Sequence, residues 1–413
     1  MPFQKYGARQ RSLSALATLG AGLMVLGGIA PAAVAQDISS QQWYLKDMQA
    51  DGMWKVSKGK GITVAVVDTG VNASISELQG QVLGGADMSR RPSSAHKDTD
   101  GHGTNMAALI AGTGANGGIQ GLAPEAKILP VKDVQDARVD SADGIVGRAI
   151  RYAADHGAQI INISQGAEAV SSQLPRTHSA VNYAIRKGSL IFAAVGNTGN
   201  KTNGVAYPAG FPGVVGVGAI DREGKATKWS NSGDQVGLVA IGDEIPTHCG
   251  DNVCTSHGTS QATAITSASA ALIWSKHPEW TNNQVLRVMM QTAAKPKSGD
   301  IPSSYVGYGS VRPRKVLIDG EGDPGPANTN PLLAREGATK PKPSESASQP
   351  AEDDSQPASD KRAAEKPAQE AKASDDGGNS TLWVALGAGV VVVAGAAVAF
   401  TVVRRRGGTM ARP

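Results

Sequence analysis

Runs of β-branched and apolar residues alternate with helical patterns along the middle of the chain. Residues 62–67 are apolar at almost every position, which is the pattern of a strand buried on both faces of a sheet. Similar runs recur at residues 159–163, 189–195 and 214–220. Strands that alternate with helices predict an α/β domain with a mostly parallel central sheet and helices on both of its faces.

Helix signals occur in four segments, namely residues 143–156, 179–187, 260–276 and 281–293. Asp143 is the predicted N-cap of the first segment, and Gly157 and Gly188 are predicted to end the first two. The third segment is mostly small or apolar, as a buried helix should be, and a capping box at residues 281–284 opens the fourth.

The first 35 residues have the pattern of a signal peptide. Basic residues precede an apolar stretch at residues 13–30, and Ala-Val-Ala at residues 33–35 is a small-residue cleavage site. An uncleaved membrane anchor is the alternative interpretation. The glycines in the apolar stretch and its small-residue end favour cleavage, so we expect the mature chain to begin near Gln36.

A second apolar segment, residues 381–403, contains no charged residue. As a helix it would span roughly 34 Å, which is enough to cross a bilayer core of about 30 Å. Two acidic residues precede it and three arginines follow it, so the positive-inside rule places residues 404–413 in the cytoplasm and residues 36–380 outside. A buried core helix is the alternative, but no globular sequence follows to bury it.

The segment at residues 321–380 is rich in Pro, Ser, Ala and charged residues and nearly free of large apolar side chains. Such a segment buries too little apolar surface to offset the loss of chain entropy. We therefore interpret it as a disordered linker that holds a folded domain, residues 36–320, away from the membrane.

The formal net charge of +4 belongs to the two ends of the chain. Three basic residues lie in the first 35 residues and four in the last ten, and neither segment contains an acid, which leaves −3 for residues 36–403. Targeting and anchoring therefore explain the positive charge, and the sequence predicts no nucleic-acid partner.

Three short motifs contain the residues best suited to catalysis. Asp68 follows the first predicted strand in Val-Val-Asp-Thr-Gly, His102 lies in Asp-Gly-His-Gly-Thr, and Ser260 opens a predicted helix in Gly-Thr-Ser. A serine hydroxyl needs a base to accept its proton, histidine can do so at neutral pH, and a carboxylate can orient the histidine. The sequence therefore predicts that these three residues form a catalytic triad.

Asn197 follows another predicted buried strand, in Ala-Ala-Val-Gly-Asn. Its amide NH₂ is predicted to donate to the oxyanion of acyl transfer, together with the backbone N–H of Ser260 at a helix N-terminus. An ordinary turn asparagine is the alternative. Asp100 lies two residues before His102 and is interpreted as a turn residue rather than a second orienting carboxylate.

The order Asp, His, Ser and the sequences around these residues resemble those of subtilisin-like serine proteases, the subtilases. Similar segments continue at residues 121–126, 161–166, 207–209 and 229–233. The resemblance covers about residues 41–319 and implies a three-layer subtilisin-like fold, peptide-bond hydrolysis without a cofactor and extended polypeptide substrates. It also implies that Ser164, Gln165 and Gly166 line the substrate cleft.

The signal peptide, protease domain, Pro-rich linker, single transmembrane helix and basic tail together resemble the mycosins, subtilases associated with type VII secretion in actinobacteria. This resemblance implies a peptidase anchored in the cell membrane, with its protease domain outside, that processes secreted proteins beside a secretion complex. The competing hypothesis is a structural or docking part of such a complex in which proteolysis is dispensable.

Three features depart from the family pattern. Residues 261–265 lack the proline and histidine that usually follow the serine, which leaves the start of that helix open. Gln165 replaces an apolar residue, so one subsite wall is expected to be more polar. The segment from Gln36 to Asp68 is too short for a folded prodomain, so maturation is expected to differ.

Cys249 and Cys254 are the only cysteines, and in an exported protein they are predicted to form a disulfide. A metal site is the weaker alternative, because no second cysteine pair accompanies them. Asp133, Asp136 and Asp140 lie in a polar segment where calcium could bind, but the spacing of a calcium-binding loop is missing. We therefore predict a solvated acidic loop and no metal.

Overall fold

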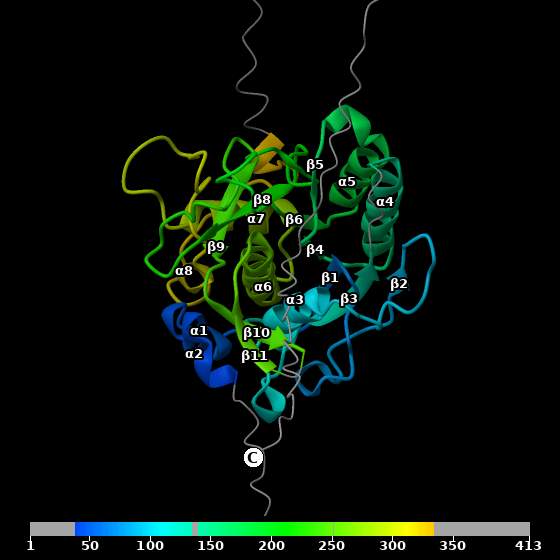
Figure 1. Cartoon of the computed structure of the whole chain (residues 1–413). Coiled ribbons are helices and arrows are strands. Elements are labelled where there is room, and N and C mark those ends of the chain that lie inside the picture. Colours follow the sequence, from blue (N-terminus) through cyan, green and yellow to red (C-terminus); the bar gives the residue numbers. More distant parts are fainter. Residues whose placement is uncertain (1–37, 134–138, 251, 334–413) are drawn as a thin grey trace, which may run out of the picture. The chain divides into compact units, whose positions relative to one another are not determined.

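Seven parallel strands form the central sheet: β1 (Thr63–Asp68), β2 (Ala86–Asp87), β3 (Lys127–Lys132), β4 (Ile160–Ile163), β6 (Leu190–Ala194), β8 (Val215–Ile220) and β9 (Val236–Ile241). Their order across the sheet is β2-β3-β1-β4-β6-β8-β9 (Figure 1). In the described residues, two antiparallel pairs lie outside this sheet: β5 (Ala167–Glu168) with β7 (Ala206–Tyr207), and β10 (Ile245–Cys249) with β11 (Asn252–Ser256).

The α-helices are α1 (Trp43–Asp47), α2 (Ala50–Trp54), α3 (His102–Ala111), α4 (Val139–Asp155), α5 (Pro175–Arg186), α6 (Thr259–Lys276), α7 (Asn282–Thr292) and α8 (Pro313–Leu317). Short 3₁₀ helices are η1 (Ser39–Gln41), η2 (Ser76–Leu78), η3 (Ala115–Gly117) and η4 (Ser171–Gln173).

This computed structural model describes residues 38–133, 139–250 and 252–333, which all belong to one unit of the chain, Met1–Pro343. The predicted signal peptide at residues 1–35, transmembrane segment at 381–403 and tail at 404–413 lie outside the described residues. In the part that is described, no helix has both the length and the apolar character needed to cross a membrane.

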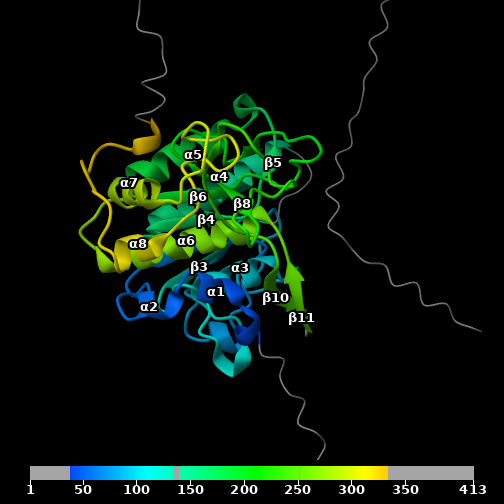
Figure 2. The same cartoon turned by 90° about the vertical axis from the view of Figure 1, so that its left-hand side faces the viewer.

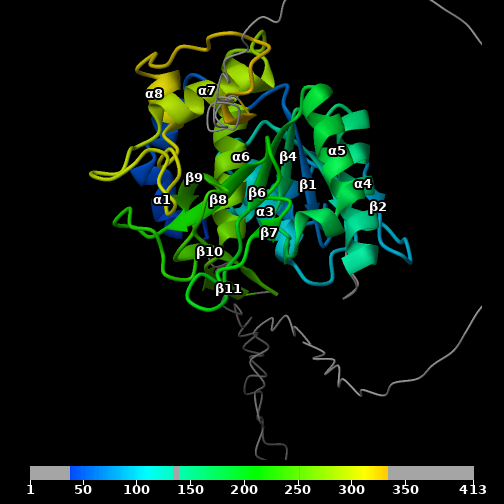
Figure 3. The ribbon, with the colours of Figure 1, turned by 90° about the horizontal axis from the view of Figure 1, so that it is seen from above.

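Helices cover both faces of the sheet, which gives three layers (Figures 1 and 3). Val64 and Val66 of β1 belong to a hydrophobic cluster with α3, α6 and α7, and Figure 2 shows α1, α2 and α8 near α6. Ala65 and Val67 belong to a second cluster with α4 and α5. Successive side chains of a strand point to opposite faces, so alternate residues of β1 pack against the helical layers on the two sides of the sheet.

The four strands predicted from apolar runs are confirmed as β1, β4, β6 and β8. The four predicted helices correspond to α4, α5, α6 and α7. Gly157 and Gly188 follow α4 and α5 with φ values of 74° and 95°, the left-handed conformation that glycine adopts at helix ends. Thr281 and Gln284 form the predicted capping box of α7.

Asp143 is not an N-cap, because α4 begins four residues earlier, at Val139. The buried Asp143 carboxylate instead accepts hydrogen bonds from the backbone N–H groups of Thr177 at 2.7 Å and Arg176 at 3.2 Å. These two residues lie in the first turn of α5. Asp143 therefore satisfies the free N–H groups at the start of α5 and ties the two helices together.

The long helix α6 is buried along most of its length although it contains several hydroxyl groups. Thr263, Thr266 and Ser269 each donate to the carbonyl oxygen four residues earlier, at 2.7, 2.8 and 2.8 Å. These bonds satisfy the hydroxyls within the helix itself, so α6 can cross the core as the predicted buried helix.

The folded part continues past residue 320, where the predicted linker begins. Gln284 Nε2 of α7 donates to Gly325 O at 3.0 Å, and Arg287 Nη1 donates to Pro326 O at 3.0 Å. The segment is poor in apolar side chains, but its carbonyl groups accept hydrogen bonds from α7. The start of the predicted linker is therefore packed against the domain, and its residues beyond 333 lie outside the described part.

Candidate active site

Asp68 ends β1 and is completely buried. Its Oδ1 accepts hydrogen bonds from Thr69 N at 2.8 Å and from His102 Nδ1 at 2.7 Å. Its Oδ2 is also buried and has no hydrogen-bond partner among the described residues. A carboxylate accepts, so Nδ1 carries the hydrogen of the neutral imidazole and Nε2 is left as the atom that can take up a proton.

Two glycines allow the start of α3 to approach β1. Gly101 has a φ of 89°, a left-handed conformation that a side chain would strain. A Cβ on Gly103 would lie 2.2 Å from the carbonyl oxygen of Gly70 and 3.0 Å from Asp68 Cβ. The glycines on both sides of His102 therefore permit the short distance between His102 and Asp68.

Asp98 closes the turn before α3. Its Oδ2 accepts from Thr104 N at 2.9 Å and from Thr104 Oγ1 at 2.6 Å, while its Oδ1 accepts from Gly101 N at 2.9 Å. The sequence analysis overlooked this residue, although Asp just before a helical segment is a recognisable capping signal. Asp100 accepts one bond, from His102 N at 3.2 Å, which agrees with its interpretation as a turn residue.

The carboxylates around His102 control its protonation. Burial lowers the pKa of His102, but the neighbouring carboxylates raise it by more, from its ordinary value of 6.5 to about 9. The largest of these contributions comes from Asp68, and smaller ones come from Asp100 and Asp98. The sequence predicts His102 as the general base, and a base must be unprotonated to act, so we expect activity to increase with pH through this range.

We expect Asp100→Asn to raise kcat/KM near neutral pH by about twofold, a small effect because exposed charges are screened. The substitution removes one negative charge and keeps an oxygen for His102 N. The pKa of His102 then falls, and the acid limb of the profile of kcat/KM against pH moves to lower pH. Asp51→Asn, an exposed change on α2, is the control. An acid limb that stays in place would contradict this role of Asp100.

Ser260 lies in the first turn of α6, which starts at Thr259 with Gly258 as its N-cap. The start of this helix, which the sequence analysis left open, is therefore regular although the chain lacks the proline that usually follows the serine in the family. The buried Ser260 Oγ donates to the carbonyl oxygen of Ser164 at 3.1 Å. The structure thus brings Asp68 and His102 into a hydrogen bond, whereas Ser260 contacts Ser164 instead of His102.

Asn197 follows β6 and is exposed, and it is tied to the start of α6. Its Oδ1 accepts from Thr259 N at 2.9 Å and from Thr259 Oγ1 at 3.0 Å. These bonds fix which end of the amide points to Thr259, so its NH₂ group is the end available to a ligand. Thr259, which the sequence analysis did not consider, therefore connects Asn197 to the residue next to it, Ser260.

The three predicted cleft residues directly follow β4. Ser164 is buried, Gln165 is half-buried and Gly166 is exposed. The next residue, Ala167, pairs with Tyr207, and a Cβ on Gly166 would lie 3.0 Å from Tyr207 O. The segment therefore runs from the Ser260 contact out to the surface, but its role in substrate binding stays a prediction.

The loop after Asn197 is held by a carboxylate that the sequence analysis did not single out. Glu168 Oε1 accepts from Thr202 Oγ1 at 2.6 Å and also from Thr198 Oγ1. These bonds lower the pKa of Glu168, against a smaller effect of burial. Glu168 thereby connects the end of the predicted cleft segment to the residue beside Asn197.

Cys249 and Cys254 form a disulfide, with their Cα atoms 5.8 Å apart, across the β10–β11 hairpin. His248 of this hairpin donates its backbone N–H to Asn105 Oδ1 of α3 at 3.0 Å, and its Nε2 lies 2.5 Å from Glu77 Oε1. The hairpin therefore packs beside the helix that carries His102 and leads directly into Gly258 and α6.

No group of three or more His, Cys, Asp or Glu side chains suited to a metal ion occurs within residues 38–133, 139–250 and 252–333. Asp133 is completely buried, so the prediction of a solvated loop is wrong for this residue, and the side chains of Asp136 and Asp140 lie outside the described part. The alternative of a calcium site at these three residues therefore stays open.

The sequence matches the model of the subtilase family over residues 59–309. Among curated proteins, thermitase of Thermoactinomyces vulgaris is 34% identical over 281 residues, which cover 68% of this chain and 96% of that protein.

Solved structures of mycosins are among those similar to this one. MycP1 from Mycobacterium smegmatis has a TM-score of 0.60 at 29% sequence identity, over 70% of this chain and 86% of that chain. A second structure, described as the serine protease MycP1, an essential component of the type VII (ESX-1) secretion system, has a TM-score of 0.60 at 30% identity. That match covers 68% of this chain and 89% of the other.

Proposed function

Because the chain belongs to the subtilase family and is a serine endopeptidase with the subtilisin-like α/β fold, we propose that Asp68, His102 and Ser260 are its catalytic triad. The hydrogen bond of 2.7 Å between His102 Nδ1 and the buried Asp68 Oδ1 is the observation that carries this proposal. Its substrates are polypeptides, as expected of an endopeptidase.

In the proposed mechanism, the Ser260 hydroxyl leaves the Ser164 carbonyl and turns to His102 Nε2. Ser260 Oγ attacks the carbonyl carbon of the peptide bond while Nε2 takes up the hydroxyl proton. Asp68 holds the imidazole in the required tautomer and stabilises the imidazolium that forms. His102 then returns the proton to the leaving amine, and a water molecule hydrolyses the acyl-enzyme by the same steps. No cofactor takes part.

The oxyanion of each tetrahedral intermediate is proposed to lie between Asn197 Nδ2 and the backbone N–H of Ser260. Asn197 Oδ1 is already bound to Thr259, so Nδ2 is held in place before substrate arrives. Donors that are oriented in advance need no reorganisation in the transition state, which is why such groups make large contributions to catalysis.

Active-site labelling tests the triad directly. We expect a serine-directed fluorophosphonate to modify the purified full-length chain at Ser260, as mapped by mass spectrometry. Labelling should be absent in Ser260→Ala and slower in His102→Ala, because the base activates the hydroxyl. Modification at another serine, or equal labelling rates in the wild type and His102→Ala, would overturn the assignment.

We further propose that the protein is anchored in the cell membrane by residues 381–403 and processes secreted proteins beside a type VII secretion complex. The order of the sequence segments supports this proposal, and so does the similarity to MycP1, described as an essential component of such a system. The proposal places the protease domain outside the membrane and residues 404–413 inside.

Fractionation of cells tests the anchor. We expect the full-length chain to stay with membranes after an alkaline wash and a chain truncated after residue 380 to be released. On intact cells, added protease should digest the folded domain and leave a tag at the C-terminus. A full-length chain that washes off, or a C-terminal tag that is digested, would contradict the proposed topology.

Comparison of Ser260→Ala with a complete deletion separates proteolysis from a structural role. If the protein acts by cleaving secreted proteins, both strains should accumulate the same unprocessed species. If secretion continues in Ser260→Ala cells and stops in the deletion strain, the docking function dominates and the proposed processing role is secondary.

A further inference from the structure

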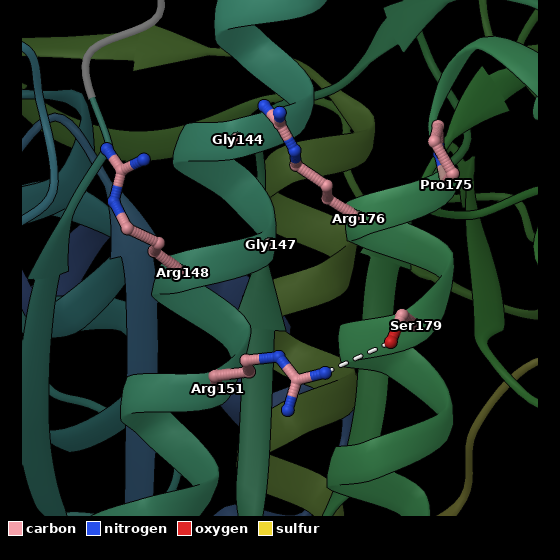
Figure 4. A pocket seen from close by; sticks show the side chains of 7 residues that line it. All are labelled: Gly144, Gly147, Arg148, Arg151, Pro175, Arg176 and Ser179. Carbon is pink, nitrogen blue, oxygen red and sulfur yellow. Dashed lines mark hydrogen bonds between the residues drawn. The ribbon is translucent and has the colours of Figure 1, made fainter.

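A pocket of about 420 Å³ lies between α4 and α5, in the helical layer on the other face of the sheet from α3 and α6 (Figure 4). Its lining includes Arg148, Arg151, Arg176 and Ser179, together with Gly144 and Gly147 of α4, which are themselves buried. The pocket therefore concentrates positive charge on a face that peptide hydrolysis does not use.

No carboxylate forms an ion pair with any of these three arginines within the described residues. Arg148 Nη2 donates to Met88 O at 2.7 Å, and Arg151 Nη2 donates to Ser179 Oγ at 3.0 Å. The nearby Asp143 is buried and bound to backbone N–H groups of α5, so its oxygens are already occupied. The guanidinium groups keep most of their donors for a ligand.

The arginine tips converge above Gly144. A Cβ on Gly144 would lie 3.3 Å from Arg176 Nη1 and 3.5 Å from Arg148 Nη1. A ligand oxygen near that point would contact both guanidinium groups at once. Figure 4 shows Arg151 and Ser179 farther along the same groove, where further oxygens of the ligand would find donors.

Packing does not explain the glycine at this position. A Cβ on Gly147 would lie 3.1 Å from the backbone C and O atoms of Arg176, so close approach of α4 and α5 favours glycine there. At Gly144 the added atom would meet only the flexible ends of two arginines. Glycine inside a helix costs about 1 kcal/mol relative to alanine, so Gly144 is unfavourable unless the space between the two guanidinium groups is used.

We propose that this pocket binds a phosphate group, with one oxygen above Gly144 between Arg148 and Arg176. Guanidinium groups form paired, charge-assisted hydrogen bonds with phosphate oxygens. The three guanidinium groups of this pocket offer more N–H donors than a carboxylate ligand could accept, which favours a phosphate group. The phosphate belongs either to a soluble phosphate compound or to the headgroup of an anionic lipid. The site is independent of the proposed triad.

Calorimetric titration of the purified full-length chain with inorganic phosphate at constant ionic strength tests the site. We expect saturable binding that weakens about tenfold or more in Arg148→Ala and in Arg176→Ala, because each loses charge-assisted hydrogen bonds. Arg186→Gln, on the same helix as Arg176 but outside the pocket, should bind like the wild type.

Gly144→Ala separates binding from folding. The new methyl group occupies the phosphate position, so binding should weaken about tenfold while the thermal midpoint stays the same or rises, because alanine favours the helix. The proposal is wrong if the wild type does not bind phosphate at millimolar concentration. It is also wrong if Gly144→Ala binds normally, or if Arg186→Gln is weakened as much as the pocket variants.

Titration with short-chain phosphatidic acid and with glycerol phosphate distinguishes the two sources. Tighter binding of the lipid than of glycerol phosphate, lost in Arg176→Ala, assigns the pocket to a lipid headgroup. Equal binding of both compounds, lost in the same variant, assigns it to a soluble phosphate compound. Binding of either compound that persists in Arg176→Ala contradicts the site.

Discussion

Ser260→Ala and His102→Ala should each lower kcat for a peptide substrate, and kcat/KM with it, by about 10⁶-fold, because the same substitutions in subtilisin lower kcat by that amount. The nucleophile and its base act as one unit, because the hydroxyl is unreactive without a proton acceptor and the acceptor is useless without the hydroxyl. The double variant should therefore be no slower than either single variant. Measurement of kcat/KM for all three tests this expectation.

Ser267→Ala is the matched control for this loss. Ser267 is buried on the same helix, two turns after Ser260, and its hydroxyl donates to Asn162 Oδ1 at 3.0 Å. Its removal should change stability and leave kcat/KM within a few-fold of the wild type. Residual activity that falls further in the double variant would show that Ser260 and His102 do not work as a pair.

The Asp68–His102 pair could be predicted from sequence because each residue follows a strong local signal. Asp68 ends a β-branched run with the pattern of a buried strand, and glycines flank His102 where the chain must approach that strand. The contact of Ser260 with Ser164 could not be predicted, because a hydroxyl rotates to whichever acceptor is nearest. That acceptor follows a strand almost 100 residues earlier in the chain.

Some strands of the central sheet could not be predicted from local sequence patterns, for a different reason. β3 lies between β2 and β1, yet its sequence contains Pro130, a residue that argues against a strand inside a sheet. β9, at the edge of the sheet, was also missed. Asp143 illustrates the same limit, since it has the local signature of a cap for α4 but caps α5 through a tertiary contact.

Asn197→Ala should lower kcat by about 10²–10³-fold with a much smaller change in KM, because the proposed bond to the oxyanion forms only in the transition state. The magnitude is the one known for the corresponding type of substitution in subtilisin. Asn200→Ala, an exposed asparagine three residues later in the same loop, should have nearly wild-type kinetics. Steady-state measurement of kcat and KM separately is needed, since kcat/KM alone does not separate ground-state from transition-state binding.

Asn197 also holds Thr259, so a loss of rate in Asn197→Ala has two possible causes. Asn197→Asp separates them, because a carboxylate still accepts the bonds from Thr259 N and Thr259 Oγ1 but has no NH₂ to offer the oxyanion. If Asn197 is a donor, the aspartate variant should be at least as slow as the alanine variant. If it acts only by holding the start of α6, the aspartate variant should recover most of the wild-type rate, and the oxyanion would have to be stabilised by the Ser260 N–H without Asn197.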